Sequence, residues 1–271
     1  MKKLFKLPFA LALLMLLASC AKFAPVADNE AYNRVMKNKV LIVGMSGEQP
    51  PFNFVVVDKA AIGFDVDVAE ALAKKLGVKL QISIMPFNDL EEALKTGMID
   101  AIISGYSVTK KREESMRFSM PYARTGQSLV FKREAGMKIR KTTGFDDKSV
   151  RITALEHSSS YDFAQTKLPN ATLKAVQHYE KALVMLRSDE ADALLADLTV
   201  CELALIRDTE GELAILNHPL NVEDVAIVFN KNEIMLQDKS STLIKELIDS
   251  EEIAKFHERW FKDAHWLALL P

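Results

Sequence analysis

The chain has 271 residues, of which 49% are hydrophobic and 27% are charged, and its formal net charge at pH 7 is −2. A chain of this length can bury one large domain or two compact lobes. The near-neutral charge gives no reason to expect a nucleic-acid partner.

The N-terminus has the pattern of a secretory signal. Three lysines within residues 2–6 precede the apolar run Leu11–Leu17, which is too short to span a bilayer. The ending Leu17-Ala18-Ser19-Cys20 resembles a bacterial lipobox, so we expect residues 1–19 to be removed and Cys20 to be lipidated. An ordinary signal peptide that holds a cysteine is the alternative. Either way the protein is exported, and with a lipid anchor on Cys20 it stays at a membrane, in the periplasm or at the cell surface.

Residues 20–37 have no apolar stripe and are predicted to form a tether between anchor and domain. Beyond them the predicted elements alternate in type. We expect strands over 40–44, 79–85 and 101–103, a helix that stops at Gly77, and a helix over 88–96. Asp65 or Asp67 is expected to cap the first of these helices, because no other ligand-type cluster accompanies them to make a metal site.

Residues 128–132 are predicted to cross into a second lobe, and residues 225–229 to return from it. Between them we expect strands over 150–154, 173–176 and 193–196, a helix from about Tyr161 and a helix over 180–186. Two terminal helices, 240–249 and 251–261, are expected to pack on the first lobe. The prediction is therefore lobe 1 over 38–127 plus 230–271, lobe 2 over 133–224, and two crossings that make a hinge.

One short pattern occurs twice in the chain. After an amphipathic helix and a polar turn, Asp-Ala leads into an apolar strand at Asp100–Ser104 and again at Asp192–Ala196, which implies two similar α/β lobes. In open α/β sheets, ligands collect at the carboxyl ends of strands. The first strand runs on toward Lys110-Lys111-Arg112 and the second runs into Asp197. A cationic side chain on one lobe that faces a carboxylate on the other is suited to bind a small zwitterion between them.

The basic segment after Thr109 reads as the start of a helix capped by that threonine. Cations are unfavourable at the positive end of a helix dipole unless an anion is meant to lie there. The guanidinium of Arg112 can hold a carboxylate with two parallel hydrogen bonds. A solvated basic turn is the alternative interpretation.

Three segments carry a family resemblance: Gly63–Ala69, Ile99–Arg112 and Phe118–Tyr122. Together they resemble the family 3 extracellular solute-binding proteins, the polar amino-acid receptors of ABC importers, over about residues 38–262. The resemblance implies a periplasmic-binding-protein type II fold, an α/β architecture of two lobes joined by two hinge crossings. It also implies a monomer without cofactor or catalysis, which captures an amino acid by closure and delivers it to a membrane permease.

The same resemblance assigns ligand-binding roles to residues of lobe 1. Arg112 is expected to grip the ligand's α-carboxylate with help from Ser107, and Ser104 to offer its carbonyl or hydroxyl to the α-ammonium. Phe87 is expected to stack on the ligand's side chain. In lobe 2, Asp197 corresponds to the ammonium-binding carboxylate; a helix N-cap is its structural alternative, and both can hold at once.

The sequence departs from the family pattern at two places. In lobe 2 the family's Gly-Thr-Thr turn corresponds to His157–Ser160, where Ser159 and Ser160 supply hydroxyls and Ser158 is expected to replace the glycine. Gln49 stands where many members place an aromatic residue, which makes one pocket wall more polar, and Glu48 beside it favours a basic or amide ligand.

Catalytic and metal-binding interpretations find less support. The five histidines show no metal-ligand spacing, so no metal is expected. His157 lies beside three serines, but no glycine elbow surrounds them. Cyclohexadienyl dehydratases resemble this fold family and depart from the Ser-Gly-Tyr-Ser-Val-Thr type of block that this chain keeps. A lyase of that kind and a ligand-sensing receptor subunit are the alternatives. Cys201 is expected to be a small buried hydrophobe.

Overall fold

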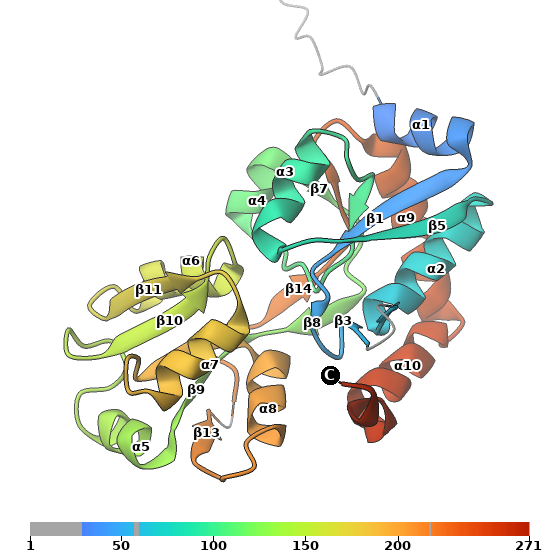
Figure 1. Ribbon diagram of the computed structural model, residues 1–271. Coiled ribbons are helices and arrows are strands. Elements are labelled where there is room, and N and C mark those ends of the chain that lie inside the picture. The colour runs from blue at the N-terminus through green and yellow to red at the C-terminus, as the bar shows by residue number, and fades with distance from the viewer. Residues whose placement is uncertain (1–28, 57–59, 217, 271) are drawn as a thin grey trace, which may run out of the picture.

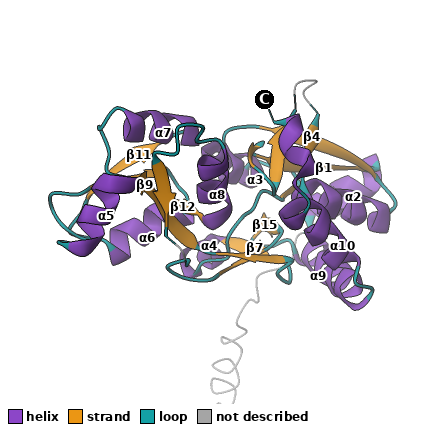
Figure 2. Cartoon of the chain, turned by 90° about the horizontal axis from the view of Figure 1, so that it is seen from below, coloured by secondary structure: helices purple, strands orange, loops and turns teal. Residues whose placement is uncertain are grey.

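The computed structural model describes residues 29–56, 60–216 and 218–270, which form two α/β lobes lying side by side (Figure 1). Figure 2 shows strands at the centre of each lobe with helices around them. Each lobe is built on one five-stranded sheet. We call the lobe that contains both described chain ends lobe 1 and the other lobe 2.

The sheet of lobe 1 has the strand order β5-β1-β6-β15-β7. The strand β1 pairs in parallel with β5 and β6, whereas β15 returns from the far end of the chain and runs antiparallel to both β6 and β7. The bounds are β1 Val40–Met45, β5 Lys79–Ile84, β6 Ala101–Ile102, β7 Met116–Phe118 and β15 Val228–Asn230. A small sheet lies beside it, formed by β2 Glu48–Gln49, β3 Asn53–Val55 and β4 Ala61–Ile62.

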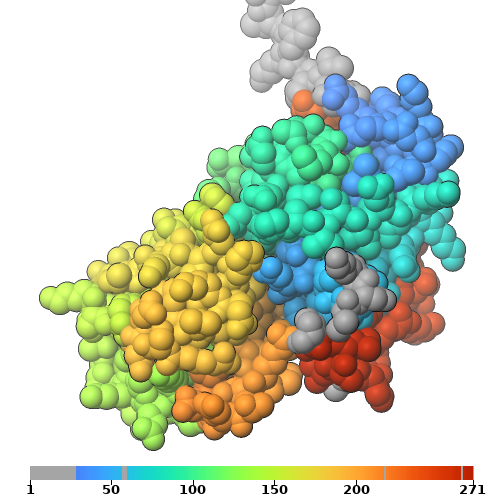
Figure 3. All heavy atoms as spheres, in the orientation of Figure 1, coloured from blue at the N-terminus to red at the C-terminus, as the bar shows by residue number. Residues whose placement is uncertain are grey.

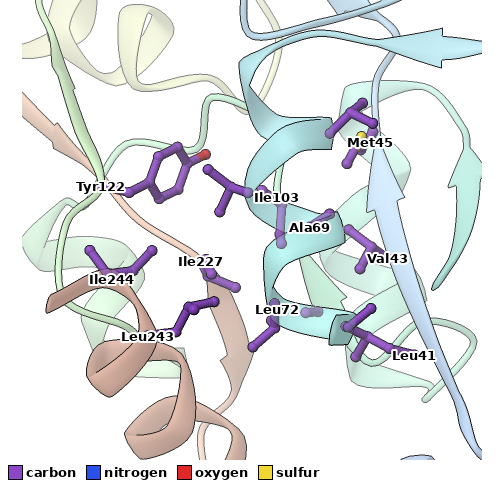
Figure 4. Close-up of a cluster of buried hydrophobic side chains, with 14 of the residues drawn as sticks. Leu41, Val43, Met45, Ala69, Leu72, Ile103, Tyr122, Ile227, Leu243 and Ile244 are labelled. Atoms are coloured by element: carbon purple, nitrogen blue, oxygen red, sulfur yellow. The ribbon is translucent and has the colours of Figure 1, made fainter. Parts of the chain in front are cut away.

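Helices from both ends of the chain cover the lobe 1 sheet. Figure 4 shows Val43 of β1, Leu72 of α2 and Leu243 of α9 in one apolar cluster, so the terminal helices pack on lobe 1. The helices are α1 Glu30–Asn38, α2 Phe64–Leu76, α3 Leu90–Lys95, α4 Lys110–Ser115, α9 Ile234–Asp249 and α10 Glu252–His257, with the short turns η1 Phe87–Asp89, η2 Glu258–Lys262 and η3 Ala264–Leu269.

The sheet of lobe 2 has the order β11-β10-β12-β9-β13. Its first three strands are parallel, and β9 runs antiparallel to both of its neighbours. The strands are β9 Gln127–Lys132, β10 Arg151–Leu155, β11 Thr172–Val176, β12 Ala193–Asp197 and β13 Leu213–Ile215, and the helices are α5 Arg133–Lys141, α6 Ser159–Lys167, α7 Tyr179–Arg187 and α8 Leu198–Ile206. The strands β6 and β12 lie where the repeated Asp-Ala pattern predicts them, and Cys201 is buried in α8 as expected.

The two lobes are joined by an antiparallel ribbon of β8 Ala123–Thr125 and β14 Glu223–Val225, which we call the hinge ribbon (Figure 1). This differs from the crossings predicted at 128–132 and 225–229. Residues 128–132 belong to β9, which is buried over most of its length between β12 and β13, and residues 228 and 229 belong to β15 of lobe 1. A buried sheet strand and a crossing segment carry the same apolar pattern, which explains the shift.

At one point the two crossings approach each other so closely that only glycine fits. A Cβ atom on Gly126, between β8 and β9, would lie 2.2 Å from the backbone oxygen of Asn221. The Asn221 side-chain oxygen Oδ1 also accepts a hydrogen bond from the backbone N–H of Gln127 at 2.7 Å. The crossings are therefore locked to each other beside the point where β9 enters lobe 2.

Among the residues that the structure describes, no helix combines the length and the apolar character needed to traverse a bilayer.

Candidate functional site

The candidate site lies where the strand ends of the two lobes meet. Ser104, Ser107 and Arg112 follow β6 of lobe 1, and Asp197 ends β12 of lobe 2. All four are at most 6% exposed, although each carries a polar or charged side chain. Figure 3 shows the two lobes in contact along the visible face, which accounts for this burial.

Arg112 is held in place by its own helix and by both lobes. Thr109 caps α4 and accepts a hydrogen bond from the Arg112 amide at 3.3 Å, which confirms the predicted helix start. The guanidinium donates from Nη1 to the Ser107 carbonyl at 2.9 Å and from Nη2 to the His157 carbonyl of lobe 2 at 3.0 Å. The solvated-turn interpretation therefore fits the exposed Lys110 and Lys111 and fails for Arg112.

An aromatic pair lies under the guanidinium. The Arg112 Cζ atom is 3.8 Å from the centre of the Tyr106 ring, and this ring stacks on Phe87 with centroids 5.4 Å apart. The Tyr106 hydroxyl donates to Glu91 at 2.5 Å. Phe87, which was expected to stack on a ligand, thus packs against the Tyr106 ring. The π face of Tyr106 in turn stabilises the Arg112 guanidinium. The sequence analysis did not single out Tyr106; an aromatic residue inside the strand-end block was the available signal.

Ser104 and Gln49 belong to one buried hydrogen-bond group. The Ser104 hydroxyl accepts from the Ser46 amide at 2.9 Å and lies 3.4 Å from Gln49 Oε1. Gln49 is 3% exposed, and its Oε1 also lies 3.3 Å from the Ser46 hydroxyl. Its role as a polar wall of the pocket stays a prediction.

Glu48 lies on the same strand as Gln49 but is exposed. Its carboxylate pairs with His178 of lobe 2 at 3.1 Å. The structure therefore places Glu48 in a contact between the lobes.

The lobe 2 turn has a left-handed residue directly before Ser158. The left-handed backbone that favours glycine occurs at His157, with φ +58°, whereas Ser158 has φ −81° and caps α6. The correspondence of Ser158 to the family's glycine stays a prediction. Ser159 and Ser160 begin α6 and are both buried, and the Ser159 hydroxyl accepts from Gln127 Nε2 at 3.1 Å.

Asp197 occupies the N-cap position of α8, but its side chain caps none of the α8 amides, all of which the structure describes. The helix-cap alternative is therefore wrong. Instead, Asp197 Oδ1 accepts from Gln127 Nε2 at 3.3 Å. Burial, and secondly the charge of Glu223, raise the pKa of Asp197 to about 7, while the Arg112 guanidinium opposes the shift. Within residues 29–56, 60–216 and 218–270, Asp197 makes no salt bridge, and the charge of Arg112 does not outweigh the effect of burial.

A second buried aspartate supports the lobe 1 side of the site. Asp65 accepts from Tyr122 Oη at 2.6 Å, from Asn53 Nδ2 at 2.7 Å and from the Gly105 amide at 2.8 Å. Burial raises its pKa to about 6 despite these bonds. The N-cap of α2 is Gly63, so the capping role expected for Asp65 is wrong. Asp65 instead fixes the backbone between Ser104 and Tyr106.

Asp67, the other candidate helix cap, also binds elsewhere. It pairs with Arg259 at 3.0 Å and accepts from the Trp260 indole at 2.8 Å. Across residues 29–56, 60–216 and 218–270, no group of three or more His, Cys, Asp or Glu side chains is arranged to hold a metal ion. The two aspartates therefore do structural work at separate places.

Comparisons with known proteins agree with this geometry. Residues 41–263 match the family model of bacterial extracellular solute-binding proteins, family 3. The chain is 29% identical over 258 residues to the arginine-binding extracellular protein ArtP of Bacillus subtilis, covering 92% of this chain and 97% of that protein.

Solved structures show the same fold. A mutant of ArgBP from T. maritima superposes with a TM-score of 0.75 at 27% identity, covering 86% of this chain and all of that one. The ancestral amino acid-binding protein AncCDT-1, described as a precursor of cyclohexadienyl dehydratase, gives 0.75 at 27% identity, covering 84% and 98%. The fold is the periplasmic-binding-protein type II fold predicted from the sequence. The chain belongs to the family 3 bacterial extracellular solute-binding proteins.

Proposed function

We propose that this protein captures an amino acid between its two lobes and presents it to an ABC permease. The observation that carries the proposal is the burial of Arg112 and Asp197, which come from opposite lobes and lie close enough for the guanidinium to oppose the rise in the pKa of Asp197. Opposite charges on facing walls match the carboxylate and ammonium of a zwitterion. The relatives support the ligand class, since ArtP is named an arginine-binding extracellular protein.

Each end of the ligand has a proposed set of partners. The α-carboxylate binds Arg112, whose guanidinium has N–H groups beyond those already donated to Ser107 and His157. The first amides and hydroxyls of α6, at Ser159 and Ser160, approach it from lobe 2, where the helix dipole favours an anion.

The α-ammonium binds Asp197, with Ser104 and Ser107 beside it. Phe87 and Gln49 border the space for the side chain. Because an unpaired buried charge is costly, ligands that lack either charged group are rejected.

Capture proceeds by rotation of the lobes about the hinge ribbon. The structure shows contacts that such closure forms: Arg112 with the His157 carbonyl at 3.0 Å, and Lys111 with Asp162 at 2.8 Å. In this proposal, lobe 1 and lobe 2 are rigid bodies, and the ribbon is their flexible joint. X-ray scattering should show a smaller radius of gyration at saturating ligand, and an unchanged profile would contradict closure.

We also propose that the mature protein begins at a lipidated Cys20, which lies outside the described residues. The lipobox-like Leu17-Ala18-Ser19-Cys20 supports this. Replacing Cys20 by alanine should then release the protein from membranes into the soluble fraction. Continued membrane association of that variant argues against the anchor.

A binding role is favoured over a catalytic one, even though AncCDT-1 is described as a precursor of an enzyme. In the described part of the chain, the His157 ring hydrogen-bonds no serine, and its side chain is 67% exposed. His157 is therefore not positioned as the general base of a neighbouring serine. A turnover assay with prephenate-like acids tests the alternative directly.

The proposed function is tested by a thermal-shift screen of the common amino acids on the protein without its signal segment. A ligand present at a thousand times its dissociation constant should stabilise the fold by about 4 kcal/mol. A complete lack of stabilisation across the amino acids would overturn the proposal.

A further inference from the structure

The hinge ribbon contributes a second carboxylate to the neighbourhood of Asp197. Glu223 of β14 is 9% exposed, and its Oε1 accepts from Asn221 Nδ2 at 2.8 Å. Its other oxygen, Oε2, is buried and has no hydrogen-bond partner among the described residues. A buried carboxylate oxygen without a donor is costly, so this atom calls for a partner from outside the chain.

Asn221 links this carboxylate to Gln127, the first residue of β9, because Asn221 Oδ1 accepts a hydrogen bond from the Gln127 backbone N–H. The Gln127 side chain is fully buried, and Nε2 donates to both Asp197 Oδ1 and Ser159 Oγ. Its Oε1, on the same amide carbon, is buried without a partner in the described structure. The Gln127 amide therefore places a free acceptor directly beside Asp197 and the first turn of α6.

Thr125 adds a third buried polar atom to the same place. It pairs across the hinge ribbon with Glu223, and its Oγ1 has no hydrogen-bond partner in the part of the chain described. Thr125, Gln127 and Glu223 thus carry unpartnered atoms on two neighbouring segments, where Thr125 pairs with Glu223 and Asn221 hydrogen-bonds both Gln127 and Glu223. Native proteins leave few such atoms unsatisfied, and a cluster of them points to a ligand.

The charges here do not balance for a neutral ligand. Asp197 and Glu223 are buried carboxylates, and Arg112 is the cation that acts on Asp197. A zwitterionic amino acid brings one positive and one negative group, and therefore leaves one negative charge of the group Asp197, Glu223 and Arg112 uncompensated. A ligand with one further positive charge compensates it, and its N–H groups find acceptors at Gln127 Oε1 and Glu223 Oε2.

We propose that Glu223 is a specificity-determining residue that, together with Asp197 and Gln127, selects amino acids of net charge +1 over neutral ones of the same shape. This inference rests on the proposed amino-acid site. It goes beyond that site by naming the net charge of the ligand and the residue that discriminates by that charge. Glu223 lies in the hinge ribbon, between the two lobes.

Arginine and citrulline provide the test, because they share a backbone and length but citrulline carries a neutral ureido group. Titration calorimetry on the unmodified protein should show arginine binding at least about tenfold more tightly than citrulline, as expected for a buried charge that gains a partner. In the variant Glu223→Gln, which keeps the side-chain shape, this preference should fall to within about threefold, mainly through weaker arginine binding.

Asp224→Asn is the matched control. Asp224 is the next residue of the same strand, its side chain is 44% exposed, and it pairs with Arg124. This variant should keep the full preference for arginine. The melting temperature of each variant shows that it is folded.

The outcomes separate the inference from the proposed function. Equal binding of arginine and citrulline by the unmodified protein, or binding of neutral amino acids alone, overturns the inference and leaves amino-acid capture standing. An undiminished preference in Glu223→Gln overturns the role of Glu223. If no amino acid binds at all, the proposed function fails and the inference with it. The comparison of arginine and citrulline binding by the unmodified protein tests the preference for a charged ligand even if Glu223→Gln does not fold.

Discussion

The two lobes contribute unlike halves to the candidate site. In the lobe 1 half, the Arg112 guanidinium and the Ser104 hydroxyl already make hydrogen bonds within the protein. Asp65 accepts three more, one of them from the Gly105 amide between these two residues. In the lobe 2 half, Asp197 accepts one bond at 3.3 Å and the Gln127 carbonyl oxygen lacks a partner among the described residues. Lobe 1 is therefore prepared for a ligand, whereas lobe 2 gains its missing partners from one. This favours binding to lobe 1 first, followed by closure of lobe 2.

The largest effect is expected from removing the cation of the prepared half. Arg112→Ala leaves the ligand's carboxylate unpaired in the closed cleft and should weaken binding by about 3 to 5 kcal/mol. Titration calorimetry with a ligand found by the thermal-shift screen measures this. Lys110→Ala, an exposed neighbour on the same helix turn, should be nearly silent. Binding by Arg112→Ala within about twofold of the parent shows that the carboxylate site is misassigned.

The next largest effect on ligand binding is expected from Asp197, in the lobe 2 half of the site. Asp197→Asn removes the charge that meets the ammonium and should weaken binding by about 2 to 5 kcal/mol. Since the pKa of Asp197 is about 7, the parent's affinity should rise as the pH increases from 6 to 8 and the carboxylate ionises. Affinity in the variant should not follow that rise. A parallel pH dependence in parent and variant removes Asp197 from the ammonium site.

The same carboxylate also sets a pH dependence of stability, with the opposite sign. The pKa of Asp197 is raised from 3.8 to about 7, so the folded protein holds this proton more tightly than the unfolded chain does. Its contribution to stability is present below about pH 4 and is lost as the pH rises through 7. Glu223, Arg112, Tyr179 and Cys201 are the other titratable groups around it. Denaturant unfolding at pH 5 and pH 8 should show a smaller difference in Asp197→Asn than in the parent.

Another test destabilises the lobe 1 half of the site at a residue that is not assigned to ligand binding. Asp65→Asn weakens three charge-assisted hydrogen bonds and should lower the free energy of unfolding by about 1.5 to 3 kcal/mol. Chemical denaturation followed by circular dichroism measures this. The exposed Glu70→Gln on the same helix is the control and should change little. An unaltered unfolding midpoint in Asp65→Asn means that the Gly105 segment is held by other contacts.

The smallest effect on ligand affinity is expected from replacing Tyr106, whose ring lies beneath the Arg112 guanidinium. Tyr106→Leu keeps an apolar side chain but removes the π face that lies 3.8 Å from Arg112 Cζ, and should weaken ligand binding by about 1 kcal/mol. Calorimetry against Tyr106→Phe separates the ring from its hydroxyl, which bonds Glu91. If Tyr106→Phe costs as much as Tyr106→Leu, the hydroxyl rather than the ring positions Arg112.

The fold and the lobe 1 half of the site were largely predictable because their signals are local. The repeated Asp-Ala pattern marks β6 and β12, and the cap at Thr109 and the cation at Arg112 lie within four residues of each other. Strand, turn and helix start are all encoded in one continuous segment. The roles that the family resemblance assigns to Ser104, Ser107 and Phe87 stay predictions until ligand binding is measured.

The remaining features depend on partners distant in the chain. The role of Asp65 needs Tyr122, which follows 57 residues later, so its position at a helix start predicted a cap instead. The left-handed residue at His157 carries no glycine to mark it. Gln127 and Glu223 are linked through Asn221, which hydrogen-bonds both, because β8, which leads into β9, pairs with β14. A weak signal was present in Thr125 and Gln127, polar residues at alternate positions beside an apolar strand.

The strand order has a consequence for how the chain folds. Lobe 2 is an insertion between β7 and β15, and its sheet is complete once β13 ends at Ile215. The sheet of lobe 1 lacks β15, which alone joins β6 to β7, until Asn230 is available. A chain that emerges from its N-terminus therefore finishes lobe 2 while the earlier lobe still has an open strand edge at β6, and its last residues close the lobe that its first residues began.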